Sequence, residues 1–235
     1  MTPVASQLGL GRRELVSLVG GGGKSTLLFR LGDELTAAGN KVILTTTTKM
    51  GRDQVLAVPT VCWSADTACV AAALDEPGPA MLLTYGDDHK VTGPPPDVVD
   101  DLYATSGVDY VIVEADGSKG RPLKAPAEHE PVIPTATTTV VILVGIDAVG
   151  HPLTQVTHRA EVAQRFLETG SDHVLTAADC AAVVLHPAGA LSACPVASRV
   201  VVAITKVGTD EEKAAALRLK AAIEVLRPGT AAVVL

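Results

Sequence analysis

Runs of apolar residues, each about as long as a β-strand, recur along the chain and are separated by polar or glycine-containing stretches. Within these runs the apolar residues are mostly consecutive and rich in Val, Leu and Ile. That pattern is typical of parallel strands buried on both faces of a sheet. We therefore predict strands over residues 15–19, 41–45, 80–84, 109–114, 139–144, 199–204 and 231–235.

Between these strands, apolar residues recur at helical spacing. The spacing predicts helices over residues 25–38, 66–74, 97–105, 158–168, 177–186 and 209–226. The last helix is marked clearly, because Thr209 or Asp210 can cap its N-terminus and Pro228 and Gly229 follow it. The alternation of strands and helices predicts an α/β fold with an open, mostly parallel sheet and helices on both faces.

A glycine-rich turn, V-G-G-G-G-K-S-T at residues 19–26, joins the first predicted strand to the first predicted helix. Glycines let the backbone approach a ligand closely, and the N–H groups and the helix dipole favour an anion. We expect a nucleoside triphosphate, ATP or GTP, bound with Mg²⁺. The match to the P-loop pattern is partial, because Leu18 stands where its first glycine would be. The residues predicted to bind the nucleotide are Gly20, Gly21, Gly22, Gly23, Lys24, Ser25 and Thr26, with Lys24 at the β- and γ-phosphates and Ser25 on Mg²⁺.

Four threonines and a lysine follow the second strand, at residues 45–49. The carboxyl ends of parallel strands border the ligand crevice of such folds, so Thr47, Thr48 and Lys49 are predicted to contact the ligand. A threonine here could also ligate Mg²⁺ or sense the γ-phosphate. The alternative is a run of β-favouring threonines that only continues the strand.

An apolar strand that ends in a carboxylate, at residues 109–114, is typical of a Walker-B element. Glu114 or Asp116 would hold Mg²⁺ and take part in catalysis. The loop that follows carries Lys119, Arg121 and Lys124, which we predict to hold an anionic second substrate. A solvated loop with scattered charges is the alternative.

The strand at 199–204 ends in T-K-V-G at residues 205–208. Many GTPases recognise guanine with [NT]-K-x-D, but here Gly208 replaces the aspartate. Guanine selectivity is therefore not supported, and a purine could still stack on the stem of Lys206. The base stays open between adenine and guanine.

The composition of the chain argues against nucleic-acid-binding and membrane-spanning proteins. The chain has 19 basic and 26 acidic residues, a formal net charge of −7, and only six aromatic residues. Nucleic-acid-binding proteins usually carry a basic surplus and aromatic rings for base stacking, so we expect no nucleic-acid polymer as a partner. No apolar run is long enough to span a membrane, and no secretory signal is readable at the N-terminus. We expect a cytoplasmic protein whose four cysteines are reduced.

The chain shows no internal repeat and no sharp change in composition, so residues 1–235 are expected to form a single P-loop NTPase-like domain. Four segments of the chain resemble the YqeC family. They are the phosphate-loop segment at 19–26, L-T-T-T-T-K-M at 44–50, D-Y-V-I-V-E-A-D-G-S-K-G-R-P-L-K-A-P at 109–126 and H-E-P-V-I-P at 129–134. That family comprises accessory proteins of selenium-dependent molybdenum hydroxylases. The resemblance implies a nucleotide-using factor whose partner is such a hydroxylase or one of its cofactor-maturation factors. It implies no catalytic residue beyond the phosphate loop.

Two functions follow from these motifs. The first is a Mg²⁺-dependent P-loop NTPase, or an enzyme that transfers a phosphoryl or nucleotidyl group to an anionic small molecule. The second is a nucleotide-gated switch, an insertion or chaperone-like factor that acts mainly by binding a partner enzyme.

Overall fold

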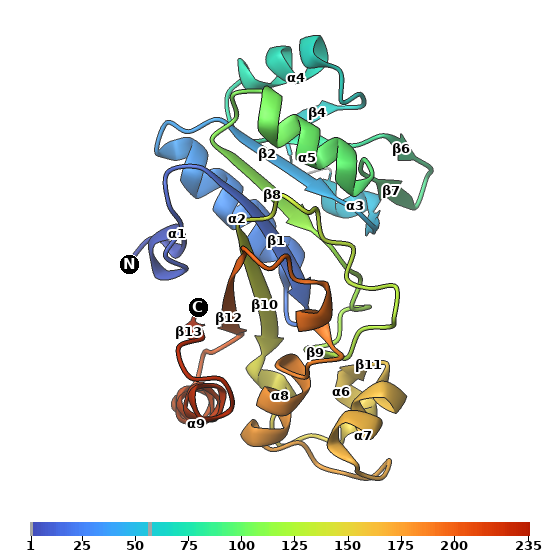
Figure 1. Cartoon of the computed structure of the whole chain (residues 1–235), viewed down its shortest axis with the longest axis vertical. Helices are drawn as coiled ribbons and strands as arrows, with labels where there is room; N and C mark the ends of the chain where they lie inside the picture. The colour runs from blue at the N-terminus through green and yellow to red at the C-terminus, as the bar shows by residue number, and fades with distance from the viewer. Residues whose placement is uncertain (1, 56–57) are drawn as a thin grey trace.

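In the computed structural model, which describes residues 2–55 and 58–235, eight parallel strands form the main sheet (Figure 1). Their order across the sheet is β13-β12-β10-β1-β8-β2-β5-β4. The chain moves from β1 to one side of the sheet, returns with β8, and then builds the other side from β10 onward. The strands are β1 (Glu14–Gly20), β2 (Val42–Thr46), β4 (Thr60–Cys62), β5 (Ala80–Leu82), β8 (Tyr110–Glu114), β10 (Thr139–Gly145), β12 (Arg199–Thr205) and β13 (Ala231–Val234).

Helices cover both faces of this sheet (Figure 1). Successive strand residues point to opposite faces, so Leu15 and Val19 of β1 belong to one buried cluster while Val16 and Leu18 belong to the other. The first cluster is closed by α4 (Thr67–Leu74), α5 (Pro96–Thr105), α7 (Ala160–Leu167), α8 (Ala177–Val184) and α9 (Asp210–Leu226), and the second by α2 (Lys24–Ala37). The predicted α/β fold, an open and mostly parallel sheet with helices on both faces, is confirmed.

The predicted strands and helices are all present, with ends that differ by one or two residues in most cases. The patterns missed several shorter elements. These are the helical turns α1 (Val4–Gln7), α3 (Arg52–Val55) and α6 (Leu153–Val156), the 3₁₀ turns η1 (Ile146–Ala148) and η2 (Ala190–Ala193), and the edge strand β4.

Two small sheets were also missed, and they are formed by segments that follow the carboxyl ends of the main strands. One is antiparallel and has the order β3-β7-β6, formed by β3 (Lys49–Gly51), β7 (Lys90–Thr92) and β6 (Tyr85–Gly86). The other pairs β9 (Leu123–Lys124) with β11 (Thr157–His158). Each strand has two or three residues, which is too short for a period of two to be read from the sequence.

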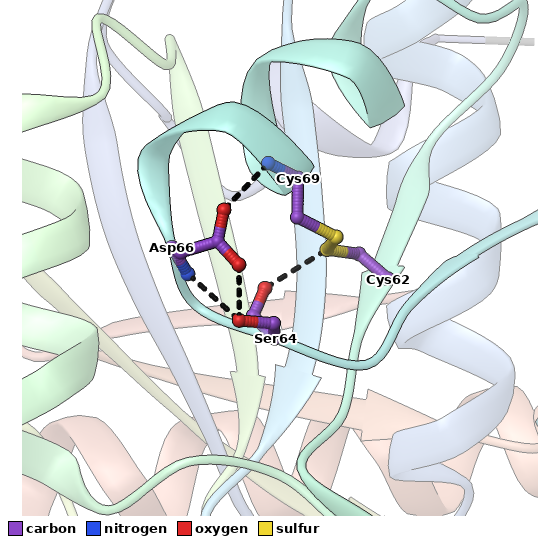
Figure 2. Close-up of a disulfide and its surroundings, with 4 residues drawn as sticks. All are labelled: Cys62, Ser64, Asp66 and Cys69. Atoms are coloured by element: carbon purple, nitrogen blue, oxygen red, sulfur yellow. Dashed lines mark hydrogen bonds between the residues drawn. A yellow bond between two sulfur atoms is a disulfide. The ribbon is translucent and has the colours of Figure 1, made fainter.

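A disulfide joins Cys62, at the end of β4, to Cys69, in the first turn of α4 (Figure 2). The expectation that all four cysteines are reduced is therefore wrong for this pair. Asp66 caps α4 by accepting a hydrogen bond from the Cys69 N–H at 2.9 Å, and this tight turn brings the two Cα atoms to 6.3 Å. The spacing of Cys62 and Cys69 in the sequence matches no recognised motif, so the disulfide becomes evident only once the turn before α4 is known. Cys180 and Cys194 are free, and burial raises the pKa of the Cys180 thiol to about 12.

Within residues 2–55 and 58–235, none of the helices combines the length and the apolar character that crossing a membrane requires.

Candidate functional site

The glycine-rich turn lies at the carboxyl edge of the sheet, between the central strand β1 and α2. Gly20, Gly22 and Gly23 have φ angles of +93°, +84° and +102°, a region that favours glycine. Glycine is required at position 21 for another reason, since a Cβ there would lie 2.6 Å from the carbonyl oxygens of Arg121 and Pro122. The turn is thus shaped by its own backbone and by the segment at residues 121–122.

Much of the backbone of this turn already makes hydrogen bonds within the protein. The Gly20 N–H donates to Asp116 Oδ2 at 3.0 Å, the Gly21 N–H to the Leu143 carbonyl at 3.0 Å, and the Gly22 N–H to the Arg121 carbonyl at 3.1 Å. The first bond of α2 runs from the Leu27 N–H to the Gly23 carbonyl. The N–H groups of Lys24, Ser25 and Thr26 therefore have no partner within the helix and point from its positive end.

Lys24 belongs to a chain of buried charges. Its Nζ donates to the Gly20 carbonyl at 2.6 Å and lies 3.2 Å from Asp116 Oδ1, and both side chains are almost completely buried. Asp116 Oδ2 lies 3.0 Å from Lys124 Nζ, which in turn lies 2.7 Å from Glu130. Glu130 also pairs with Arg159 at 2.6 Å. The lysine that would bind phosphate is therefore linked through alternating charges to the start of α7.

The same chain of charges sets the protonation of Glu130. Burial raises the pKa of this carboxyl, but the hydrogen bonds from Lys124 and Arg159 outweigh that effect and hold the pKa below its usual value. Glu130 is consequently a carboxylate at neutral pH, and the chain alternates in sign along its whole length.

Ser25 and Glu114 form the pair that suits a magnesium ion. Ser25 Oγ donates to Glu114 Oε2 at 2.7 Å, and Glu114 is 8% exposed at the end of β8. Burial raises the pKa of Glu114, against the opposing effects of Lys24 and of the Ser25 hydrogen bond. A hydroxyl and a carboxylate are hard oxygen ligands of the kind that Mg²⁺ prefers, so these two residues fit the ion. Asp116 lies between two lysines instead.

A cavity of about 400 Å³ opens beside this pair. It is lined by Lys24, Ser25, Thr26 and Glu114 and, on its other side, by residues that come from the small β3-β7-β6 sheet, from α3 and from the loop after β8. Of the ligand-binding residues predicted in the loops at residues 45–49 and 119–124, Lys49 and Lys119 line this cavity. Sequence reasoning missed Lys90 of β7 and Asp53 of α3, which line it too, because only the pairing of β3 with β7 brings those segments together.

Other predicted residues lie elsewhere. The Thr47 hydroxyl donates to the Val132 carbonyl at 2.6 Å, and the Thr48 hydroxyl lies 3.4 Å from that of Thr46, so neither lines the cavity. Arg121 has an exposed side chain and contributes its carbonyl to the turn. Lys124, predicted to hold an anionic substrate, is instead buried: its Nζ contacts Asp116, Glu130 and the Gly117 carbonyl. That prediction is corrected, because the three contacts use all its donors.

A second cavity, of about 280 Å³, lies on the other side of the turn. Gly23 and Thr26 line both cavities, and the second is completed by Arg30 of α2, Thr205 at the end of β12, and Lys206. Lys206 Nζ pairs with Asp147 at 2.7 Å, so its stem lies along the cavity while its charge is neutralised. The start of α2 therefore separates two cavities, one polar and rich in lysine, the other beside the Lys206 stem.

Comparisons with known proteins agree with the sequence motifs. The sequence model of the family described as YqeC protein matches residues 16–161. The chain is 36% identical over 191 residues to the uncharacterized protein YqeC of Escherichia coli (strain K12), covering 78% of this chain and 72% of that one.

Among solved structures, the chain is similar to the signal recognition particle 54 kDa protein of Aeropyrum pernix K1 in complex with GDP, with a TM-score of 0.46 and 16% identity. It is also similar to FtsY of Mycoplasma mycoides, with a TM-score of 0.42 and 13% identity. These alignments cover 96% and 92% of this chain but only 42% and 58% of the two matched chains.

Proposed function

The chain belongs to the YqeC family, and from this premise we propose that it is a Mg²⁺-dependent nucleotide-binding protein that transfers a phosphoryl or nucleotidyl group to an anionic second substrate. The observation that carries the proposal is the meeting of Lys24, Ser25 and Glu114 on one cavity at the N-terminus of α2. We further propose that it acts in the maturation of selenium-dependent molybdenum hydroxylases, as the family resemblance implies.

In this proposal the nucleotide lies across the start of α2. Its base and ribose occupy the cavity beside Thr205 and the Lys206 stem, and its terminal phosphates occupy the cavity beside Ser25 and Glu114. The N–H groups of Lys24, Ser25 and Thr26, which have no partner within the helix, point at the phosphates, and the Lys24 ammonium neutralises the charge on the phosphate oxygens. Bound Mg²⁺ would add further neutralisation at the β- and γ-phosphates. Because phosphoryl transfer needs positioning and charge compensation more than a covalent nucleophile, these groups are sufficient for it.

The test is calorimetric titration with ATP and with GTP, each with and without Mg²⁺. Lys24→Ala is expected to abolish measurable binding of the triphosphate. Glu114→Gln is expected to remove the gain in affinity that Mg²⁺ gives while leaving metal-free affinity within about threefold, because a carboxamide is a poor ligand for the ion. Lys41→Ala, at the opposite edge of the sheet, serves as the control. Wild-type protein that binds neither nucleotide, or Lys24→Ala protein with full affinity and turnover, would refute the proposal.

One observation favours a second function, the nucleotide-gated switch. The Arg121 carbonyl on the Gly22 N–H and the contacts of Lys24 and Lys124 with Asp116 connect the glycine turn directly to residues 116–124. A triphosphate that draws Lys24 away would alter that segment. If the triphosphate changes protease sensitivity of residues 115–130 while turnover without a partner is negligible, the switch is favoured. Multiple turnover with a small anion favours the transferase.

A further inference from the structure

The small β3-β7-β6 sheet presents a charged face to the cavity of about 400 Å³ beside Ser25 and Glu114. Lys49 lies opposite Thr92, and Lys90 lies opposite Gly51, in the register of β3 and β7. Directly opposite residues have side chains on the same face of a sheet, and so do residues two apart on a strand. Lys49 and Lys90 therefore share one face, while Met50 and Val91 between them lie on the other and are buried at 2% and 1% exposure. We name Lys49 and Lys90 the lysine face.

A third lysine lines the same cavity and comes from the loop after β8. Lys119 and Gly120 have φ angles of +50° and +74°, and the Arg121 N–H donates to the Ser118 carbonyl at 3.0 Å, so residues 118–121 form a tight turn with Lys119 at its tip. A non-glycine residue in this region costs about 1 kcal/mol or more, and residues of this kind cluster at functional sites. The turn holds Lys119 over the cavity that the lysine face lines.

These three ammonium groups stand outside the close ion pairs of the described part of the chain. Lys49, Lys90 and Lys119 form no ion pair with a carboxylate of residues 2–55 or 58–235, in contrast to Lys24 and Lys124. Asp87, which precedes Lys90 in the β6-β7 turn, accepts the His89 and Lys90 N–H groups on its Oδ1. These hydrogen bonds lower the pKa of its carboxyl, and the charge of Lys49 adds to that effect.

Two acids line the cavity wall: Glu114 is turned to Ser25, and Asp53 forms no ion pair with a lysine of the described residues. Since the single carboxylate of Asp53 stands against Lys49, Lys90 and Lys119, this part of the wall keeps a net positive charge that an anionic ligand can balance.

Resting on the proposed function, we propose that the lysine face and Lys119 bind the second substrate, and that this substrate is a small phosphate monoester. Three ammonium donors converge on one cavity, and a phosphate dianion offers three acceptor oxygens and two negative charges. A single carboxylate would leave lysine charge uncompensated. The cavity of about 400 Å³ exceeds the room that the terminal phosphates of a nucleotide need, and its size suits a small molecule.

The experiment fills the nucleotide site first. Full-length protein is saturated with a non-hydrolysable triphosphate and Mg²⁺, so that the γ-phosphate position is occupied, and inorganic phosphate is then titrated by calorimetry. Lys49→Met and Lys90→Met keep the length of the side chain and remove its charge. Each is expected to weaken phosphate affinity at least tenfold, as for the loss of a charge-assisted hydrogen bond, and to change triphosphate affinity less than threefold. Lys41→Met, an exposed lysine at the opposite edge of the sheet, is expected to change neither.

Several results would overturn the inference and leave nucleotide binding standing. Equal losses of triphosphate and phosphate affinity in Lys90→Met would mean that the lysines hold the γ-phosphate. Absence of phosphate binding to the nucleotide-loaded protein would remove the second site, and acetate binding as tightly as phosphate would overturn the assigned class. Failure of the triphosphate itself to bind would refute the proposed function instead. The dependence of phosphate affinity on Lys90 in nucleotide-free protein would then decide whether the lysine face binds a phosphate.

Discussion

Asp116 is the residue on which the buried charges of the site depend. It contacts the Lys24 and Lys124 ammoniums and accepts from the Gly20 N–H, and it is 1% exposed. Two buried lysines without their shared carboxylate would be costly, because desolvation of a charge is repaid only by a close partner.

Asp116→Asn is therefore expected to lower the free energy of unfolding by about 3–5 kcal/mol, measured by urea denaturation at pH 7. The matched control is Asp147→Asn, which breaks the half-exposed pair with Lys206 and should cost about 0–1 kcal/mol. Similar small losses in both variants would show that the chain of charges does not stabilise the fold.

Sequence patterns identified residues of the candidate site where the signal is local. Lys24, Ser25 and Glu114 stand at the ends of recognisable strands or at the start of a helix, and the sheet brings them together. Lys90 was missed because its place depends on the pairing of β7 with β3, about forty residues earlier in the chain. Lys124 was misassigned because its partner Glu130 cannot be identified from charge spacing alone.

Among the elements, α8 offers a clear test of helix capping. Thr176 accepts from the Asp179 N–H, and Asp179 accepts from the Thr176 N–H and hydroxyl, which makes a capping box. Burial raises the pKa of Asp179, but the Thr176 hydrogen bonds and His173 outweigh it and hold the pKa below the usual 3.8.

Thr176→Ala is expected to lower the free energy of unfolding by about 1 kcal/mol at pH 7. Since the folded pKa of Asp179 is depressed, its contribution is present above pH 3.8 and is lost as the pH falls through the folded value. The difference between variant and wild type should therefore shrink in acid, which thermal melts across a pH series can measure. Thr154→Ala, an exposed threonine in α6, is the control. A difference that is independent of pH would contradict the role of Asp179.

Long apolar runs made the main strands predictable, whereas the small sheets were not. Met50 and Val91 alternate with polar residues over only three positions each, so their strands emerge only when the two segments meet. The same applies to β9 and β11, which join residues more than thirty positions apart.

For the whole molecule, the disulfide between Cys62 and Cys69 lies at one end of the main sheet. Strands β5, β2 and β8 separate β4 from the glycine turn at β1. Closing a loop of this short length stabilises a fold by about 2 kcal/mol in the chain-entropy model.

Reduction with dithiothreitol is expected to lower the free energy of unfolding by about 2 kcal/mol and to leave nucleotide affinity within about twofold. Urea denaturation with and without the reductant measures the first effect, and calorimetry measures the second. The double variant Cys62→Ala, Cys69→Ala should not respond to reductant. A large change in nucleotide affinity on reduction would show that the two ends of the sheet are coupled.

That residues 1–235 fold as one domain stays a prediction.

The internal hydrogen bonds of the glycine turn occupy donor groups that a bound triphosphate would use. A triphosphate that uses the Gly22 N–H and the Lys24 ammonium must displace the Arg121 carbonyl and Asp116. The observed dissociation constant is then the intrinsic one divided by the fraction of molecules in which residues 116–122 have already moved away. With about one molecule in a hundred in that open state, affinity falls about a hundredfold. A partner that holds this segment outward would restore the affinity without touching the nucleotide, and by reciprocity the nucleotide would strengthen the partner's own binding.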